Sequence, residues 1–214
     1  NLKIENNMVE QDGGGIYSYN SFIRSSNILI ANNSASTGGA IALYYSDANL
    51  EHLTMIGNAA DEFGGGIYSD NSNLNISNSI LWGNTPDAIV GQANVMYSNI
   101  EDTIWVGDGN INASPLFCEP DSGDYTLAEN SPCIGSGEDG ANMGAFEVGC
   151  AAFILEPVLA EIPDTTINED ENLTLTISAE SLLDYSVTYT AISDTADVQA
   201  NTLDSIVILT VSDN

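Results

Sequence analysis

The feature that most constrains this chain is a short phrase that recurs three times at nearly equal spacing. The phrase consists of glycines, with one alanine, followed by isoleucine, and its isoleucines are Ile16, Ile41 and Ile67, which are 25 and 26 residues apart. A second phrase recurs with the same period and ends in asparagine, at Asn7, Asn32, Asn58 and Asn84. Two independent marks with one period and no helical patterning indicate a solenoid.

Each repeat contains strand-length apolar runs between turn-forming residues. The runs at residues 28–30, 54–56 and 80–82 are rich in β-branched and aromatic residues, and Gly, Asn, Ser or Asp bound them, as is typical of strands. After the glycines, Ile16 and Ser18 would face one way and Tyr17 and Tyr19 the other. A coil of this length accommodates three such strands joined by turns.

Stacked coils place equivalent residues in ladders, because neighbouring strands lie roughly 4.8 Å apart. We expect the repeated isoleucines to form an inward aliphatic ladder. We expect the four repeated asparagines to form an amide ladder at a turn, each side chain bonding to the coils above and below. A polar side chain is tolerated inside a protein when it is paired in this way.

These phrases resemble the GG[GA]I…N repeat of polymorphic outer-membrane proteins and related secreted bacterial right-handed parallel β-helix proteins. Ile30, Ile56 and Trp82 occupy the slot where that family often has Phe. An ordered series of motifs also resembles the last coils and C-terminal cap of such proteins: YSNI at 97–100, GDGNI at 107–111, SPLF at 114–117, GDYTL at 123–127, NSPCI at 130–134 and MGAFE at 143–147. The resemblance covers residues 1 to about 150. Since residues 2–7 already read as the end of a repeat, we expect further coils upstream.

Composition changes after Cys150. Residues 151–214 contain no Gly, Lys or Arg, whereas all 19 glycines lie before them, so we expect domains at 1–150 and 151–214. Strands are predicted at 173–177, 185–190 and 205–211. Residues 162–175 and 211–214 resemble the start and the last strand of bacterial cadherin-like, immunoglobulin-like repeats; the loop that holds calcium in those repeats would fall at 179–184, which reads AESLLD.

The predicted fold class is therefore all-β: a right-handed parallel β-helix with a C-terminal cap, followed by a short β-sandwich-like module. The resemblance implies the handedness, the cap and the module. The periodicity alone indicates only the solenoid.

The charge balance excludes one class of partner. Two basic residues face 31 acidic ones, for a net charge of −29, so little could neutralise nucleic-acid phosphates. No apolar run approaches the roughly 18 residues of a membrane span. We predict a secreted or cell-surface protein in a salty medium, since salt screens the repulsion between its acidic side chains. The acids are scattered, so we expect no cofactor, with Ca²⁺ binding as the alternative.

The three cysteines fall in the predicted cap. A bridge from Cys118 to Cys133 would close a short loop and staple the end of the solenoid. An odd count leaves the connectivity open, with Cys150 either free or paired with Cys133 instead. A zinc site is not expected, because no close C-x-x-C pair exists and His52, the sole histidine, is distant in sequence.

An enzyme of the β-helix class would need a base or a carboxylate pair. Arg24 is the best candidate base, but its repeat counterparts are Leu50 and Ile76, so no acids accompany it. No pair recurs at matching coil positions among the acids that stacking could bring close, which are Asp47, Asp61, Glu62 and Asp70. With a single histidine, no nucleophile–base pair is visible. We therefore predict no catalytic residue.

The best binding candidates are aromatic. Tyr17, Ala42 and Tyr68 align, as do Tyr19, Tyr44 and Asp70, on the outward face if the isoleucines point inward. The candidate ligand-binding residues are Tyr17, Tyr19, Tyr44 and Tyr68. Exposed rings with neighbouring amides and carboxylates could stack on sugars, while ordinary packing between strands is the competing interpretation.

The resulting hypothesis is a non-catalytic stalk or adhesin segment of a large secreted or surface protein, in contact with extracellular carbohydrate or a surface protein and joined to further domains of the same chain. The first alternative is an accessory part of a β-helix polysaccharide lyase or glycoside hydrolase whose catalytic coils lie upstream. A passenger segment that only spans distance is the second. Architecture does not decide between them.

Overall fold

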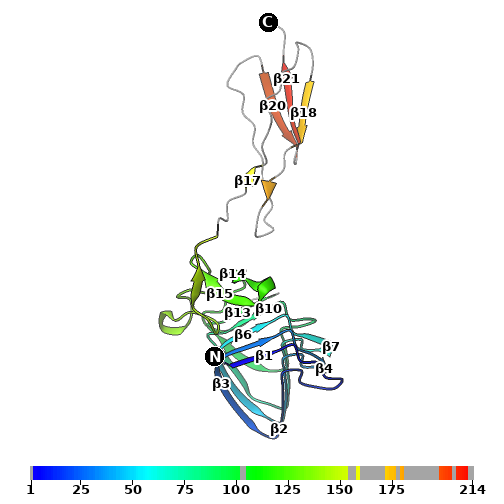
Figure 1. Ribbon diagram of the computed structural model, residues 1–214, viewed down its shortest axis with the longest axis vertical. Coiled ribbons are helices and arrows are strands. Elements are labelled where there is room, and N and C mark those ends of the chain that lie inside the picture. Colours follow the sequence, from blue (N-terminus) through cyan, green and yellow to red (C-terminus); the bar gives the residue numbers. More distant parts are fainter. Residues whose placement is uncertain are drawn as a thin grey trace. The chain divides into compact units, whose positions relative to one another are not determined.

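The computed structural model describes residues 2–101 and 105–153, and the backbone of five strands further along. The chain divides into two units, Asn1–Phe153 and Ile154–Asn214, three residues beyond the predicted boundary (Figure 1). Each unit is described by itself below.

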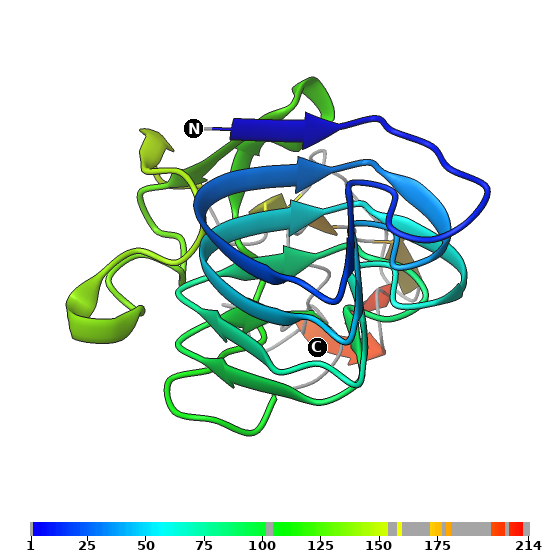
Figure 2. The ribbon, with the colours of Figure 1, turned by 90° about the horizontal axis from the view of Figure 1, so that it is seen from below.

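The first unit is a parallel β-solenoid whose coils stack along the chain (Figure 2). Strands of successive coils pair in parallel and in register, so they form sheets that run along the solenoid. One sheet contains β2 (Ile16–Tyr19), β5 (Ile41–Tyr44), β8 (Ile67–Asp70) and β11 (Ile89–Val90). The largest contains β1 (Leu2–Glu5), β3 (Phe22–Ala31), β6 (Asp47–Ile56), β9 (Leu74–Ser77), β10 (Ile80–Trp82), β12 (Ala93–Met96) and β13 (Asn99–Ile100). The third pairs β4 (Ser34–Thr37) with β7 (Ala59–Phe63).

Left-handed backbone marks the corners of each coil. In the coil of residues 16–40 the positive φ angles are those of Asn20 (48°), Asn27 (56°), Asn32 (54°) and Gly38 (67°), which favour Asn and Gly. Each coil holds three strands as predicted, β2, β3 and β4 in one and β5, β6 and β7 in the next. A coil nevertheless has four sides, because the ten-residue strands β3 and β6 each bend in the middle. Asn27 makes this bend in β3, and His52 (49°) makes it in β6.

The repeated glycines serve a close approach between coils. A Cβ on Gly39 would lie 2.3 Å from the carbonyl oxygen of Ala59 and 2.5 Å from that of Gly65. No real side-chain atom fits there, so the second residue of the phrase must be glycine.

The predicted aliphatic ladder is confirmed. Ile16 pairs with Ile41, Ile41 with Ile67, and Ile67 with Ile89 in consecutive coils. Ile41 and Ile67 are buried in the main apolar cluster, and Ile16 packs against it.

The amide ladder exists, but one of its four predicted members is wrong. Its rungs are Asn7, Asn33, Asn58 and Asn84. Asn32 is instead the exposed corner residue with φ 54°, and it occupies the position of Gly57 and Gly83 in later coils. Because two asparagines stand side by side, a period of 25 or 26 residues selects either one. The same one-residue error affects Ile30, since Ala31 is the residue in register with Ile56 and Trp82.

Each ladder asparagine follows a left-handed corner, and Asn33 and Asn58 bond to the coils on both sides. The Nδ2 of Asn58 donates to Oδ1 of Asn84 and to the carbonyl of Ile30, both at 2.9 Å. Its own Oδ1 accepts from the backbone N–H and from Nδ2 of Asn33, both at 3.0 Å. Serines do the same at another corner, where Ser46 N–H donates to Ser72 Oγ at 2.8 Å.

The last part of the first unit packs on a flank of the solenoid. It contains β14 (Phe117–Glu119), β15 (Asp124–Ala128), β16 (Val148–Cys150) and the short 3₁₀ turns Pro120–Ser122 and Glu138–Gly140. A second apolar cluster joins Phe117 and Leu127 to Leu29 and Ile80 of the solenoid, and Ala145 N–H donates to Thr54 Oγ1 at 3.0 Å. These contacts lie on the outer face of the largest sheet, so the predicted cap over the open end of the last coil stays a prediction.

The predicted disulfide is wrong. The bond joins Cys118 to Cys150, which lie on the two strands that flank β15. Cys133 is a buried free thiol whose sulfur accepts a hydrogen bond from Asn99 Nδ2 at 3.1 Å. Burial raises the pKa of the Cys133 thiol to about 11. Closeness in sequence favoured Cys133, whereas the order of the strands brings Cys150 beside Cys118.

The second unit contains antiparallel strands. They are β17 (Val158–Leu159) paired with β19 (Ala179–Glu180), and β18 (Asn172–Thr176), β21 (Ile206–Val211) and β20 (Val198–Leu203) in that order. The strands predicted at 173–177 and 205–211 correspond to β18 and β21, whereas β20 was not predicted. The strand predicted at 185–190 and most of the loop at 179–184 lie outside the described residues. The β-sandwich and the cadherin-like relationship stay predictions.

Candidate functional site

Five tyrosines gather on the side of the solenoid formed by β2, β5 and β8 and on its adjoining corner. The predicted alignments of this side are confirmed: Tyr17, Ala42 and Tyr68 share one row, and Tyr19 pairs with Tyr44 in the next. The rings cross between rows, with centroids 5.8 Å apart for Tyr17 and Tyr44 and 5.6 Å for Tyr44 and Tyr68. We call this set the tyrosine surface; its members are Tyr17, Tyr19, Tyr44, Tyr45 and Tyr68.

The tyrosine surface has supporting rings and exposed rings. Tyr44 and Tyr68 are half-buried, and Tyr44 OH donates to Asp12 Oδ2 at 2.9 Å. Burial, together with this carboxylate, raises the pKa of Tyr44, and the hydrogen bond to Asp12 holds the ring in place. The exposed fractions of Tyr17, Tyr19 and Tyr45 are 54%, 60% and 57%.

Tyr45 was not predicted as part of this surface. It is a corner residue with φ 49°, and its ring meets that of Tyr19 edge to face at 5.9 Å. A strand alternation rule assigns no face to a corner residue, so only the position of the corner reveals it.

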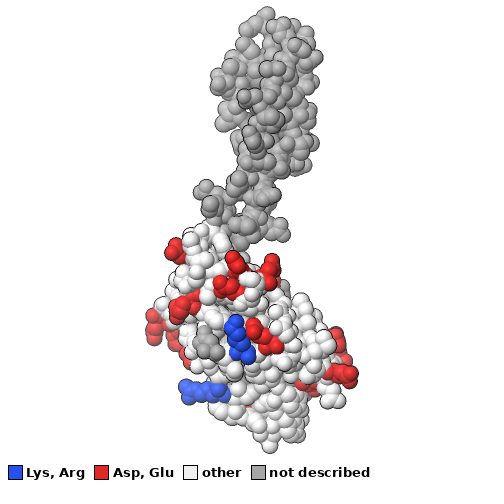
Figure 3. Space-filling view, viewed as in Figure 1, with Lys and Arg blue, Asp and Glu red and all other residues white. Residues whose placement is uncertain are grey.

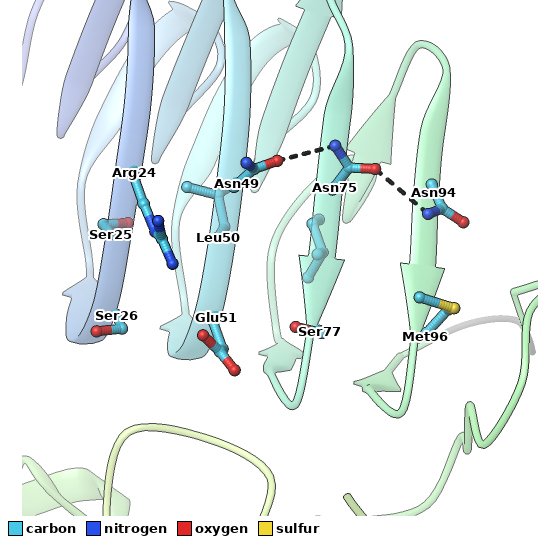
Figure 4. Close-up of a pocket in the computed structure, with 11 residues that line it drawn as sticks. Arg24, Ser25, Ser26, Asn49, Leu50, Glu51, Asn75, Ser77, Asn94 and Met96 are labelled. Carbon is cyan, nitrogen blue, oxygen red and sulfur yellow. Dashed lines mark hydrogen bonds between the residues drawn. The ribbon is translucent and has the colours of Figure 1, made fainter. Parts of the chain in front are cut away.

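A polar groove lies on the next side of the solenoid, across β3, β6, β9 and β12 (Figure 4). We call it the amide groove. Its central row aligns Arg24 with Asn49, Asn75 and Asn94, so the predicted counterparts of Arg24, Leu50 and Ile76, are wrong by one residue. The remaining lining residues are Ser25, Ser26, Leu50, Glu51, Ile76, Ser77 and Met96.

The three asparagines of this row form a surface ladder. Asn75 Nδ2 donates to Asn49 Oδ1 at 2.9 Å, and Asn94 Nδ2 donates to Asn75 Oδ1 at 3.3 Å (Figure 4). All three side chains are exposed, whereas Asn33, Asn58 and Asn84 of the amide ladder are buried. The signal in the sequence is an Asn that recurs in three successive coils, at intervals of 26 and 19 residues, which the one-residue misalignment concealed.

No acidic candidate is in register with another in a neighbouring coil: Asp47 pairs with Phe22 and Asp70 with Tyr44. Asp47 Oδ1 accepts from Asn73 Nδ2 at 2.7 Å, and Asp70 accepts from Asn71. Asp61 and Glu62 lie on β7, on a different side of the solenoid. His52 lies 3.9 Å from the carboxylate of its neighbour Glu51, so the histidine has a local partner rather than a nucleophile.

The acidic side chains are scattered over the face of the first unit shown in Figure 3. Across residues 2–101 and 105–153, no three His, Cys, Asp or Glu side chains come together as a metal site. In the same part of the chain, no helix has the length and apolar character needed to span a bilayer.

Comparison of the chain with models of known protein families, with curated proteins and with solved structures found no match.

Proposed function

We propose that the chain is a non-catalytic segment of a secreted or cell-surface protein and that it contacts extracellular carbohydrate through the tyrosine surface. The observation that carries this proposal is the group of three exposed rings, each more than half exposed, beside two rings that are packed in place. A right-handed coil, an end cap, and an immunoglobulin-like second unit belong to the same proposal.

The chemistry of the surface suits a sugar. A tyrosine ring offers an apolar face for the C–H groups of a pyranose and a hydroxyl for hydrogen bonds at its rim. Tyr17 is held by Tyr44, and Tyr19 by Tyr45, so binding costs little loss of side-chain freedom. The parallel stack of coils gives a stiff support on which such rings keep fixed spacing.

A glycan array tests the proposal, run with millimolar Ca²⁺ and with a chelator. The variant Tyr17→Ala/Tyr19→Ala/Tyr45→Ala removes the exposed rings and leaves Tyr44 and Tyr68 in place. We expect its affinity for the bound glycans to fall at least tenfold, which corresponds to about 1.4 kcal/mol.

The matched control is Phe63→Ala, which removes an exposed ring from β7 on another side of the solenoid. It should bind as the unmodified chain does, and both variants should keep the melting temperature within a few degrees. Equal loss in the control and in the triple variant, or no glycan bound by the unmodified chain, would overturn the proposal.

A further inference from the structure

We infer that the amide groove is a second binding site, and that it takes a linear, uncharged oligosaccharide laid across the coils. This inference accepts carbohydrate as the ligand class from the proposed function but rests on different residues. The strands of the amide groove are β3, β6, β9 and β12. They contribute none of the five tyrosines, so the two sites can be tested separately.

The surface ladder has a fixed polarity. Each Nδ2 donates to the asparagine of the preceding coil, so the Nδ2 of Asn49 is the free donor at the Arg24 end and the Oδ1 of Asn94 is the free acceptor at the other (Figure 4). An amide nitrogen has two N–H groups and its oxygen two lone pairs, and the ladder uses one of each at Asn75. Every rung therefore keeps hydrogen-bonding capacity for a ligand.

The spacing of these rungs suits a polymer. Neighbouring strands lie roughly 4.8 Å apart, so Arg24, Asn49, Asn75 and Asn94 repeat at that interval along the groove. An extended sugar chain has a repeat of similar size, and its hydroxyls can both donate and accept. A row of amides with unused donors and acceptors complements a row of hydroxyls rather than a row of single-sign charges.

Charge favours a neutral ligand. Among the residues that line the groove, only Arg24 and Glu51 are ionised. Within the described part of the chain, the Arg24 guanidinium forms no ion pair. The groove thus carries one charge of each sign within a chain of net charge −29, which repels polyanions. Arg24 can donate to vicinal hydroxyls and Glu51 can accept from them.

Phe22 borders the site beside its Arg24 end. It lies two residues before Arg24 on β3, on the same outward face, and its side chain is 61% exposed. The ring is in register with Asp47, one row of outward side chains away from the row of amides, and provides a stacking platform for a sugar beside Arg24.

Calorimetric titration with defined sugars tests this inference. The probes are cellohexaose, xylohexaose and mannohexaose, with the matching disaccharides, and hexagalacturonate as the acidic counterpart. We expect at least one neutral hexasaccharide to bind at least tenfold more tightly than its disaccharide and than hexagalacturonate. The variant Asn49→Ala/Asn75→Ala should weaken that binding at least tenfold.

The tyrosine triple variant is the matched control, because it changes no residue of the groove. It should keep the hexasaccharide binding that the asparagine variant loses, so failure of the tyrosine proposal and failure of this one are distinguishable. Loss of binding in the tyrosine variant but not in the asparagine variant would overturn the inference. So would preference for hexagalacturonate, or the absence of binding by all three neutral hexasaccharides at millimolar concentration.

Discussion

Replacing Asn58 with alanine is expected to lower the free energy of unfolding by about 3 kcal/mol. Asn58 is fully buried and hydrogen-bonds to three residues in the two coils that flank its own. The substitution leaves the amide of Asn33, the Oδ1 of Asn84 and the carbonyl of Ile30 without these bonds. Unsatisfied buried polar groups cost more than the bonds themselves contribute, so the loss is larger than for a surface asparagine.

Urea denaturation followed by circular dichroism measures this loss. The matched control is Asn32→Gly, because Asn32 is an exposed corner residue and glycine already occupies the equivalent position in the next two coils. Its free energy of unfolding should change by less than about 0.5 kcal/mol. If Asn32→Gly proves as costly as Asn58→Ala, the ladder has been assigned to the wrong asparagine.

Removing the disulfide should have an effect of similar size. Cys118 and Cys150 are 32 residues apart in sequence, and a cross-link across such a loop restricts the unfolded chain. The chain-entropy argument gives about 3–4 kcal/mol for this loop. We therefore expect Cys118→Ser/Cys150→Ser to lose about that much stability, and to lose first the packing of β14–β16 on the flank of the solenoid.

Cys133→Ala serves as the control for the pairing. It removes a buried thiol and keeps the bond, so it should cost about 1 kcal/mol. Peptide mapping under non-reducing conditions should still recover Cys118 linked to Cys150. A linked Cys118–Cys133 peptide in the unmodified chain would contradict the assigned connectivity.

The sequence predicts well the features that recur once per coil, because the repeat period determines their positions. Ile41 and Ile67 lie one coil apart after the same glycines, so the stacked isoleucines, the parallel strands and the alignment of Tyr17 with Tyr68 follow from counting. Gly39 could be predicted as a site of close contact for the same reason.

The sequence predicts poorly which residues occupy the corners, because the period does not determine where each coil turns. Asn32 and Asn33 are equally compatible with the period, and only the backbone angle at the corner separates the corner residue from the ladder residue. The same one-residue error in register concealed the row that joins Arg24 to Asn49. Positive φ at Asn27 and His52 gives the coil a fourth side, and neither residue type specifies a corner by itself.

The cysteine pairing and the flank packing depend on contacts between segments far apart in sequence. Cys150 reaches Cys118 because β16 and β14 both border β15, an arrangement that no local pattern encodes. Leu29 and Ile80 face outward from the largest sheet, yet they are buried because residues 117–147 cover them. Alternation predicts which side chains share a face, but not what covers that face.

The most direct test of the account is the chain length of a bound glycan after prolonged incubation with the protein. A glycan that binds on the array is incubated in free form with the protein overnight. The products are then separated by high-resolution anion-exchange chromatography, and ultraviolet absorbance detects unsaturated ends. The account predicts that the glycan binds and keeps its length. Shortened or unsaturated products would assign a lyase or hydrolase activity to this chain, and either product would contradict a non-catalytic role.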